Sequence, residues 1–184
     1  MSRLTVCRED DPAAPLIDTR DPGGIAAELA KIGVRFERWP AEAALSVDAD
    51  DAEVIAAYAG DIARLSNEGG YRSVDVIRIA PDNPDRQTLR ARFLSEHRHD
   101  EDEVRFFVEG AGLFYLREQG NVHMMLCEAG DLISVPAGIR HWFDMGPTPR
   151  FTAIRLFTSP EGWVARFTGD AIAEVFPRFK AAPA

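Results

Sequence analysis

Two stretches of the sequence decide the fold: EHRHDEDEVRFFVEG, which runs from Glu96 to Gly110, and GDLISVPAGIRHWF, which runs from Gly130 to Phe143. The first follows the pattern HxHxxxE with a glycine at its end, and the second follows GxxxxxPxGxxH. Together the two patterns supply three imidazoles and one carboxylate, from His97, His99, Glu103 and His141. The chain has only four histidines, so the gathering of three in these patterns favours a shared role.

The spacing of these side chains predicts a metal site. Side chains two residues apart on a strand point to the same face, so His97 and His99 can bind one ion. Three imidazoles and one carboxylate suit a divalent metal such as iron, nickel, manganese, copper or zinc. The fourth histidine, His123, lies in the apolar run VHMML, and we expect it to be a strand residue with no metal role.

The paired motifs resemble those of the cupin superfamily, whose members are small antiparallel β-barrels with a metal in the mouth. The spacing matches in both halves up to the last metal ligand. Met145 stands where the superfamily often has an asparagine, four residues after the final histidine. That position is not a ligand, so the resemblance still implies an intact metal site.

Composition limits the classes of function. The length of 184 residues suits one domain with a sizeable core. A net charge of −9 argues against nucleic-acid binding, and no apolar run is long enough to span a membrane. The N-terminal residues lack the apolar core of a signal peptide, and Cys7 and Cys127 form no CxxC motif. We therefore expect a cytoplasmic chain with two free thiols, and its acidic charge favours a monomer or loose dimer, of which we expect the monomer.

In the N-terminal half, hydrophobic residues recur at the spacing of strands in some segments and at the spacing of helices in others. Period-two alternation predicts strands over 3–7, 34–39 and 74–80. A spacing of three and four predicts helices over 21–33 and 50–70, the second starting at a capping box made by Asp50 and Glu53. A third helix is expected to start at Asn83-Pro84, an N-cap followed by proline, and to lead into the metal motif.

From the metal motif onward the alternation is typical of short strands. We expect strands over 103–108, 112–118, 122–127, 131–135, 141–145 and 151–157. Regular short strands of this kind indicate a barrel or sandwich. The tail, GDAIAEVFPRF (169–179), predicts a last short helix interrupted at Pro177.

The expected fold is mainly β with flanking helices, a cupin barrel with an α/β N-terminal extension. We expect a single domain over 1–184, in which a mixed α/β wrap covers 1–92. The metal-binding barrel core then covers 93–160, and a C-terminal helical tail covers 161–184.

Two arginines point to an anionic ligand. Four protein ligands leave two positions open on a metal that prefers six, and a bidentate oxygen substrate would fit them. Glu103 and Arg105 share a strand face, so Arg105 should point inward. A buried arginine is costly without an anionic partner, and that partner is either a ligand or an acid of the chain: Glu103, Asp102 or Glu109. Arg155 points either inward or to the surface of its strand.

The resemblance narrows around the motifs. The runs HDEDEVRFFVEGAGLFYL (99–116) and VPAGIRHWFDMGPTPRFTAIRLF (135–157) strongly resemble the bacterial acireductone dioxygenase family. This resemblance implies a dioxygenase that cleaves 1,2-dihydroxy-3-keto-5-methylthiopentene with O₂ in methionine salvage. With Fe(II) the implied products are formate and 2-keto-4-methylthiobutyrate. With Ni(II) they are formate, carbon monoxide and 3-methylthiopropanoate.

The same resemblance implies roles for individual residues. Fe(II) or Ni(II), one per chain, would be held by His97, His99, Glu103 and His141. Arg105 would act in catalysis by favouring the substrate dianion, and Arg155 would support the substrate's oxygen atoms. The methylthio tail would be walled by Phe93, Phe143 and Trp163. Glu96 would act in metal incorporation, and Asp102 would relay local conformational change.

Two alternatives remain at this stage. One is another metal-cupin enzyme, either a different dioxygenase or a sugar-phosphate isomerase, because the two arginines could equally bind a carboxylate or phosphate. The other is a non-catalytic cupin that binds metal to sense or store it. Oxygen uptake separates a dioxygenase from an isomerase, and a sensor would bind metal without turnover. The runs DEVRFF and IRHWFDMG fit the acireductone enzymes better.

Overall fold

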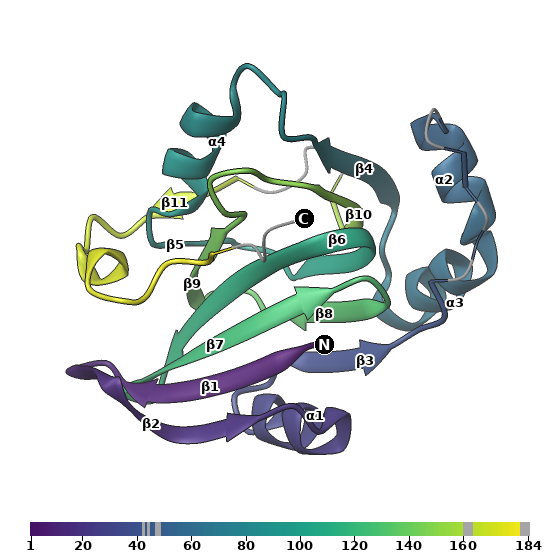
Figure 1. The fold of residues 1–184 in the computed structure, drawn as a ribbon. Helices are drawn as coiled ribbons and strands as arrows, with labels where there is room; N and C mark the ends of the chain where they lie inside the picture. Colours follow the sequence, from purple (N-terminus) through teal and green to yellow (C-terminus); the bar gives the residue numbers. More distant parts are fainter. Residues whose placement is uncertain (42, 44, 47–48, 160–163, 181–184) are drawn as a thin grey trace.

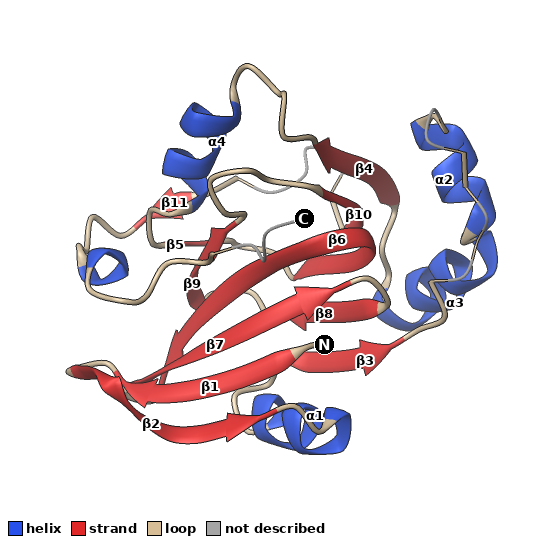
Figure 2. Ribbon diagram, viewed as in Figure 1, coloured by secondary structure: helices blue, strands red, loops and turns tan. Residues whose placement is uncertain are grey.

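Strand β6 (Glu103–Glu118) is the strand about which the fold is built (Figure 1). The structure, a computed structural model, describes residues 1–41, 43, 45–46, 49–159 and 164–180. Within them, β6 takes part in two sheets, because its first and second halves pair with different neighbours. Strands dominate and helices lie at the periphery, which confirms the predicted mainly-β class with flanking helices (Figure 2).

The two sheets are antiparallel throughout. The first half of β6 lies in a sheet ordered β4 (Ser73–Ile79), β10 (Phe151–Phe157), β6, β8 (Asp131–Val135) and β3 (Arg35–Arg38). The second half lies in a sheet ordered β11 (Arg166–Phe167), β5 (His97–Arg98), β9 (Arg140–Asp144), β6, β7 (Asn121–Glu128), β1 (Arg3–Arg8) and β2 (Asp11–Thr19). The path of paired strands runs from β11 to β2, and across the described ranges it does not close on itself.

A bulge and a glycine carry β6 from one sheet into the other. The pairing with β10 shifts by one residue at Val108. Gly110 follows with a φ of +74°, and a Cβ atom there would lie 1.8 Å from the Arg150 carbonyl oxygen, so only glycine fits. The structure therefore has one bent strand where the sequence predicts two, over 103–108 and 112–118.

The bulge also changes which side chains of β6 face inward. Before it the inward residues are odd-numbered, as with Phe107, and after it they are even-numbered, as with Phe114. These rings pack between the sheets with Phe143 and Phe151, with ring centroids 4.9 to 6.5 Å apart. This aromatic cluster forms a close-packed inner core beneath the metal motif.

The helices cover three different faces. Helix α1 (Pro22–Ala30) adds Ile25 and Leu29 to the inner core. Helices α2 (Asp51–Ala57) and α3 (Ala59–Gly69) lie together on one side of the molecule and cover the outer face of the sheet that contains β4 (Figure 1). The outer face of the other sheet packs against the 3₁₀ turn Ile172–Glu174. In the part of the chain that the structure describes, no helix is long and apolar enough to cross a membrane.

Two predicted helices differ from the observed ones. The helix expected over 50–70 keeps its capping box but breaks at Tyr58, whose backbone leaves the helical region (φ −114°, ψ 19°). The buried Tyr58 ring packs edge-on against Phe106 at 5.1 Å, so tertiary packing overrides the helical period. The helix expected to start at Asn83 is α4 (Arg86–Phe93), because the Asn83 side chain accepts a bond from the Asp85 N–H in a local turn.

Strand β2 and the C-terminal tail also differ from the sequence prediction. Strand β2 has no counterpart among the predicted strands; it contains Pro12 and Pro15, and it lies at the edge of its sheet, where proline is tolerated. The tail expected as a helix over 169–179 forms only the 3₁₀ turn Ile172–Glu174. Short strand β11 precedes it, pairing with β5 and so reaching the metal motif.

Candidate metal centre

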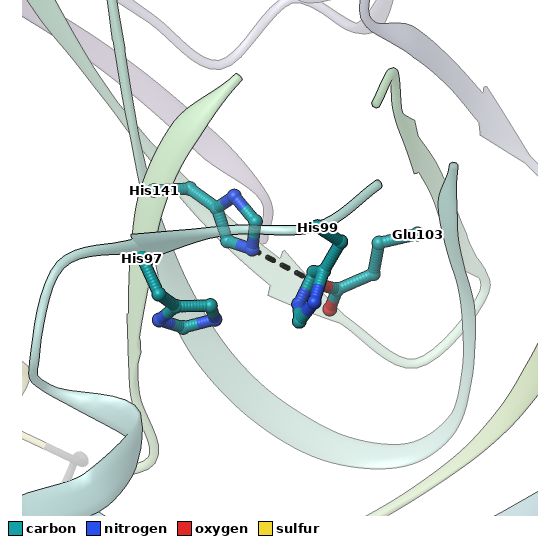
Figure 3. A group of neighbouring side chains, drawn as sticks. All are labelled: His97, His99, Glu103 and His141. Carbon is teal, nitrogen blue, oxygen red and sulfur yellow. Dashed lines mark hydrogen bonds and ion pairs between the residues drawn. The ribbon is translucent and has the colours of Figure 1, made fainter. Parts of the chain in front are cut away.

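Four buried side chains meet where the two sequence motifs come together. His97 lies on β5, His99 follows that strand, Glu103 begins β6 and His141 lies on β9. His97 and His141 are directly paired between β5 and β9. One ligand atom from each of the four lies within 4.8 Å of the others (Figure 3). The structure thus brings together all four ligands that the sequence predicts.

The backbone sets the orientation of all three imidazole rings. Each Nδ1 lies 2.8 to 3.2 Å from a backbone carbonyl oxygen: Ser95 for His97, Val164 for His99 and Ile139 for His141. A carbonyl oxygen only accepts hydrogen bonds, so each Nδ1 is the donor. The neutral ring then carries its lone pair on Nε2, the form that binds a metal.

The Glu103 carboxylate adds a further acceptor beside the Nε2 atoms of these histidines. Its Oε2 lies 3.0 Å from Nε2 of His141 and 3.2 Å from Nε2 of His99. Two lone pairs facing each other at such distances require a cation between them, either a proton or a metal ion. Nitrogen and oxygen donors in this number fit a divalent transition metal.

The protonation states also suit a metal site. Burial, together with the neighbouring His141, lowers the pKa of His97 to about 4, so this imidazole is neutral at physiological pH. Burial alone would raise the pKa of Glu103, but the charge of Arg105 and the close contacts with His141 and His99 hold it well below its usual range. The carboxylate is therefore ionised and the imidazole neutral, as metal ligands must be.

A cavity of about 580 Å³ opens over the four ligands. Strands β4, β10 and β6 line one side, with Ile77, Phe157 and Arg105 among the lining residues. Phe93, at the end of α4, and Phe143 on β9 form an apolar wall, with ring centroids 6.2 Å apart in an edge-to-face arrangement. Trp163, the third residue expected in this wall, lies outside the described residues.

Arg105 points into the cavity, as the strand alternation predicts. Its Nε lies 2.9 Å from Oε1 of Glu103, so the internal ion pair that the sequence left open is also present. The guanidinium carbon lies 4.8 Å from the centroid of Phe143 and 5.2 Å from that of Phe114. Burial lowers the pKa of Arg105, and the charge of Glu103 opposes that effect. A cation is thus held beside the ligand cluster in an apolar setting.

Arg155 also lines the cavity, which settles the direction that the sequence left open. It is directly opposite Arg105 in the β10–β6 pair. Its guanidinium donates two hydrogen bonds to Asp75 on β4, at 2.7 and 2.6 Å. Sequence reasoning missed Asp75, although its position in the strand VDVIRIA, with Ile77 on the same face, was a usable signal.

Glu96 and Asp102 are each adjacent in the chain to a predicted metal ligand. Glu96 is buried next to His97, and its carboxylate accepts bonds from Arg117 at 3.1 Å and Thr168 at 2.5 Å. Asp102 lies next to Glu103 and accepts a bond from the Ala137 N–H at 3.0 Å, in the turn that precedes β9.

The remaining histidine and the two cysteines lie outside the ligand cluster. His123 is a buried residue of β7 and is not one of its members. Cys7 and Cys127 are buried free thiols.

Known proteins share this architecture. The profile of the ARD/ARD' family matches residues 4–165. An acireductone dioxygenase of Parvibaculum lavamentivorans is 61% identical, and the match covers 100% of both chains. One of Serratia proteamaculans is 59% identical over 97% of this chain and 99% of its own.

Among solved structures, an acireductone dioxygenase from Bacillus anthracis, with a cadmium ion in its active centre, superposes with a TM-score of 0.81. It is 30% identical to this chain, and the match covers 91% of this chain and 98% of that structure. The expected cupin fold is thereby confirmed. The chain belongs to the ARD/ARD' family, and it is an enzyme of the acireductone dioxygenase class.

Proposed function

We propose that the chain cleaves the acireductone 1,2-dihydroxy-3-keto-5-methylthiopentene with O₂ as a step of methionine salvage. The observation that carries this proposal is the buried cluster of three imidazoles and one carboxylate, with Arg105 beside it, at the base of a cavity. The substrate is a small molecule with two adjacent enol oxygens and a neighbouring carbonyl. A cation-lined cavity of about 580 Å³ suits the anion of such a molecule.

His97, His99, Glu103 and His141 would hold one Fe(II) or Ni(II) ion per chain. When bound, such a metal supplies a Lewis acid and a template for the substrate's paired oxygens. With iron in the site we expect formate and 2-keto-4-methylthiobutyrate. With nickel we expect formate, carbon monoxide and 3-methylthiopropanoate. The same donor set suits both metals, and intrinsic affinity favours nickel, so supply would decide which is bound.

Arg105 would favour the doubly ionised substrate. Loss of both enol protons leaves two negative charges, and a buried guanidinium stabilises such charge far more than water-exposed cations do. The ion pair with Glu103 and the rings of Phe143 and Phe114 hold this guanidinium in place before substrate arrives. Arg155, on the neighbouring strand, would support the substrate's oxygens from the other side.

The apolar wall would receive the methylthio tail. Phe93 and Phe143 pack edge to face above the inner core, which keeps both rings fixed and excludes water from that side of the cavity. We assign Trp163 to the same wall on the family resemblance. The tail would gain from burial of its apolar surface, whereas the ionised head would lie near the two arginines.

Glu96 and Asp102 would act through their neighbours. The Glu96 side chain is held by Arg117 and Thr168, which suits a part in incorporating the metal at the adjacent His97. Asp102 joins the start of β6 to the turn before β9 through Ala137, so a shift at Glu103 would pass to the segment that carries His141.

We further propose that the enzyme acts as a cytoplasmic monomer. Both cysteines are free thiols, which suits a reducing compartment, and the net charge of −9 disfavours self-association. Small molecules, the acireductone and O₂, would be its partners. Light scattering at micromolar concentration should give the mass of one chain.

Oxygen uptake tests the proposed reaction. Metal-stripped protein is reconstituted anaerobically with Fe(II), given the acireductone, and exposed to a measured amount of O₂. We expect one O₂ consumed and one formate formed per substrate, with no such reaction above background in the metal-free control. Substrate conversion without oxygen uptake would indicate an isomerase, and metal binding without conversion would indicate a sensor or store.

A further inference from the structure

A second carboxylate faces the cavity, outside both sequence motifs. Among the described residues that line the cavity, Asp75 and Glu103 are the acids. Asp75 on β4 is directly opposite Arg155 on β10, and Arg155 is directly opposite Arg105 on β6. Residues directly opposite one another in antiparallel strands share a face, so these three side chains form a row across three strands.

The charges along this row are ordered. At one end Arg155 donates from Nε and Nη2 to the two carboxylate oxygens of Asp75, at 2.7 and 2.6 Å. At the other end Nε of Arg105 lies 2.9 Å from Oε1 of Glu103. The two arginines occupy directly opposite positions, and each is paired with its own acid. Like charges at directly opposite positions repel, and the acid beside each arginine offsets part of that repulsion.

The contact with Asp75 fixes the plane of the Arg155 guanidinium as well as its position. Two parallel N–H···O bonds leave little freedom of rotation, and such paired contacts are the most geometrically specific that arginine makes. Phe157, two residues further on β10, adds a second restraint, since the guanidinium carbon lies 5.4 Å from its ring centroid. The Arg155 side chain is 23% exposed, and it reaches the cavity from this restrained position.

We propose that Asp75 is a positioning residue for the substrate. Its carboxylate holds Arg155 beside Arg105, so that both cations face the ionised enol oxygens. It also keeps Arg155 away from Glu103, which is diagonal to Arg155 across the β10–β6 pair and within reach of a long side chain. Without Asp75, Arg155 turns toward Glu103 and leaves the substrate. This inference rests on the substrate role proposed above for Arg155.

A double-mutant cycle on the Fe(II)-loaded enzyme tests the assignment, with KM, kcat and bound metal measured for each variant. Asp75→Asn should raise KM for the acireductone about tenfold, the loss expected for one misplaced charge-assisted contact, with kcat changed less than about threefold. Arg155→Ala should raise KM at least as much. In the Arg155→Ala background Asp75→Asn should change nothing further, because Asp75 acts only through Arg155.

Two further variants separate positioning from general stabilisation. Asp75→Glu keeps a carboxylate that can reach Arg155 and should recover most of the affinity. Glu109→Gln removes an acid of β6 that forms an exposed ion pair with Arg150 away from the cavity, and it should leave KM unchanged.

The outcomes distinguish the two proposals. An unchanged or lowered KM in Asp75→Asn, with a raised KM in Arg155→Ala, would overturn the role of Asp75 alone. An unchanged KM in Arg155→Ala would instead remove the substrate role of Arg155. Loss of bound metal in Asp75→Asn would place its effect at the ligands and would also overturn the assignment. The expected result is a raised KM, full metal and a non-additive cycle.

Discussion

His97 and His141 lie directly opposite one another in the β5–β9 pair, with their ring centroids 4.5 Å apart. The two sequence motifs meet a second time where Glu103 at the start of β6 is opposite Val135 on β8. Strands from the two motifs thus pair with each other on both sides of the site, and this pairing fixes the relative positions of the ligands. The candidate metal centre is therefore built into the sheet hydrogen bonding and is not carried on loops alone.

Removing a ligand should abolish metal binding. His99→Asn takes away one imidazole whose Nδ1 is held by a backbone carbonyl, so the remaining donors leave the site incomplete. We expect bound Fe(II) or Ni(II), measured by elemental analysis after reconstitution and desalting, to fall to a small fraction of the wild-type content. His123→Asn is the matched control, because His123 is a buried histidine outside the ligand cluster, and it should keep full metal. Equal metal in both variants would remove His99 from the ligand set.

Glu103 should matter to stability even before metal binds. Glu103→Ala leaves Arg105 buried without the carboxylate that lies 2.9 Å from its Nε. Breaking one side of a buried ion pair costs about 3–5 kcal/mol, because the remaining charge stays desolvated. Urea unfolding of the metal-free variant should therefore show a loss of this size, and metal should no longer stabilise it. A stability equal to wild type would mean that Arg105 finds another partner without cost.

Arg105 should affect turnover and not metal content. Arg105→Ala removes the buried cation beside the ligand cluster, and the loss of one preorganised charge-stabilising group typically costs about 10²–10³ in rate. We expect kcat/KM to fall by that factor with full metal retained. Arg150→Ala is the control, since Arg150 is an exposed arginine just before β10, and its kcat/KM should stay at the wild-type value. A near-normal kcat/KM for Arg105→Ala would remove Arg105 from the mechanism.

The metal-free protein should lose stability as the pH falls. The folded protein lowers the pKa of His97 to about 4, whereas a histidine in an unfolded chain titrates near pH 6.5. The unfolded state therefore takes up this proton first. The contribution of neutral His97 is complete above about pH 6.5 and is lost progressively toward pH 4, by about 3 kcal/mol in all.

Comparing wild type with His97→Asn isolates this group from the acidic residues that titrate in the same range. Urea unfolding at pH 7.5 and pH 4.5 should show a smaller loss of stability for His97→Asn than for wild type. Equal losses in the two proteins would show that His97 titrates normally.

The bend in β6 should depend on Gly110. Gly110→Ala forces a left-handed backbone onto alanine and also drives a Cβ atom against the Arg150 carbonyl. Gly120 has the same φ of +74° and nothing within 4 Å of its Cβ position, so Gly120→Ala measures the backbone strain alone.

We expect Gly120→Ala to lose about 1 kcal/mol and Gly110→Ala at least about 3 kcal/mol, read as shifts in the urea midpoint. Equal losses would show that the strand can move away from Arg150 without cost.

The ligands could be predicted from the sequence because their spacing is local. HxHxxxE places three donors close together in the chain, on β5, on the turn that follows it and at the start of β6, and alternation places Arg105 with Glu103. For Asp75, the alternation of VDVIRIA indicates only that it shares a strand face with Ile77. Its role depends on β4 pairing with β10, which lie far apart in the chain, and no local period reveals which strands pair.

Other elements were missed because tertiary packing outweighed a local preference. The break at Tyr58 follows from packing on Phe106, and the prolines of β2 are tolerated only because that strand lies at an edge. The bulge at Val108 inserts one residue into the inward and outward alternation of β6, so the sequence predicts two strands where the structure has one bent strand. In each case the deciding contact is made with a residue distant in the sequence.

The most direct test of the central claim is product analysis with two metals in the same protein. Metal-stripped enzyme is loaded anaerobically with Fe(II) or with Ni(II) to equal occupancy, and each sample receives the acireductone and O₂. We predict formate and the keto acid from the iron form, and formate with carbon monoxide from the nickel form. Loss of both reactions in His99→Asn should tie them to the one cluster. If neither the iron form nor the nickel form consumed oxygen at full metal occupancy, the account would be contradicted.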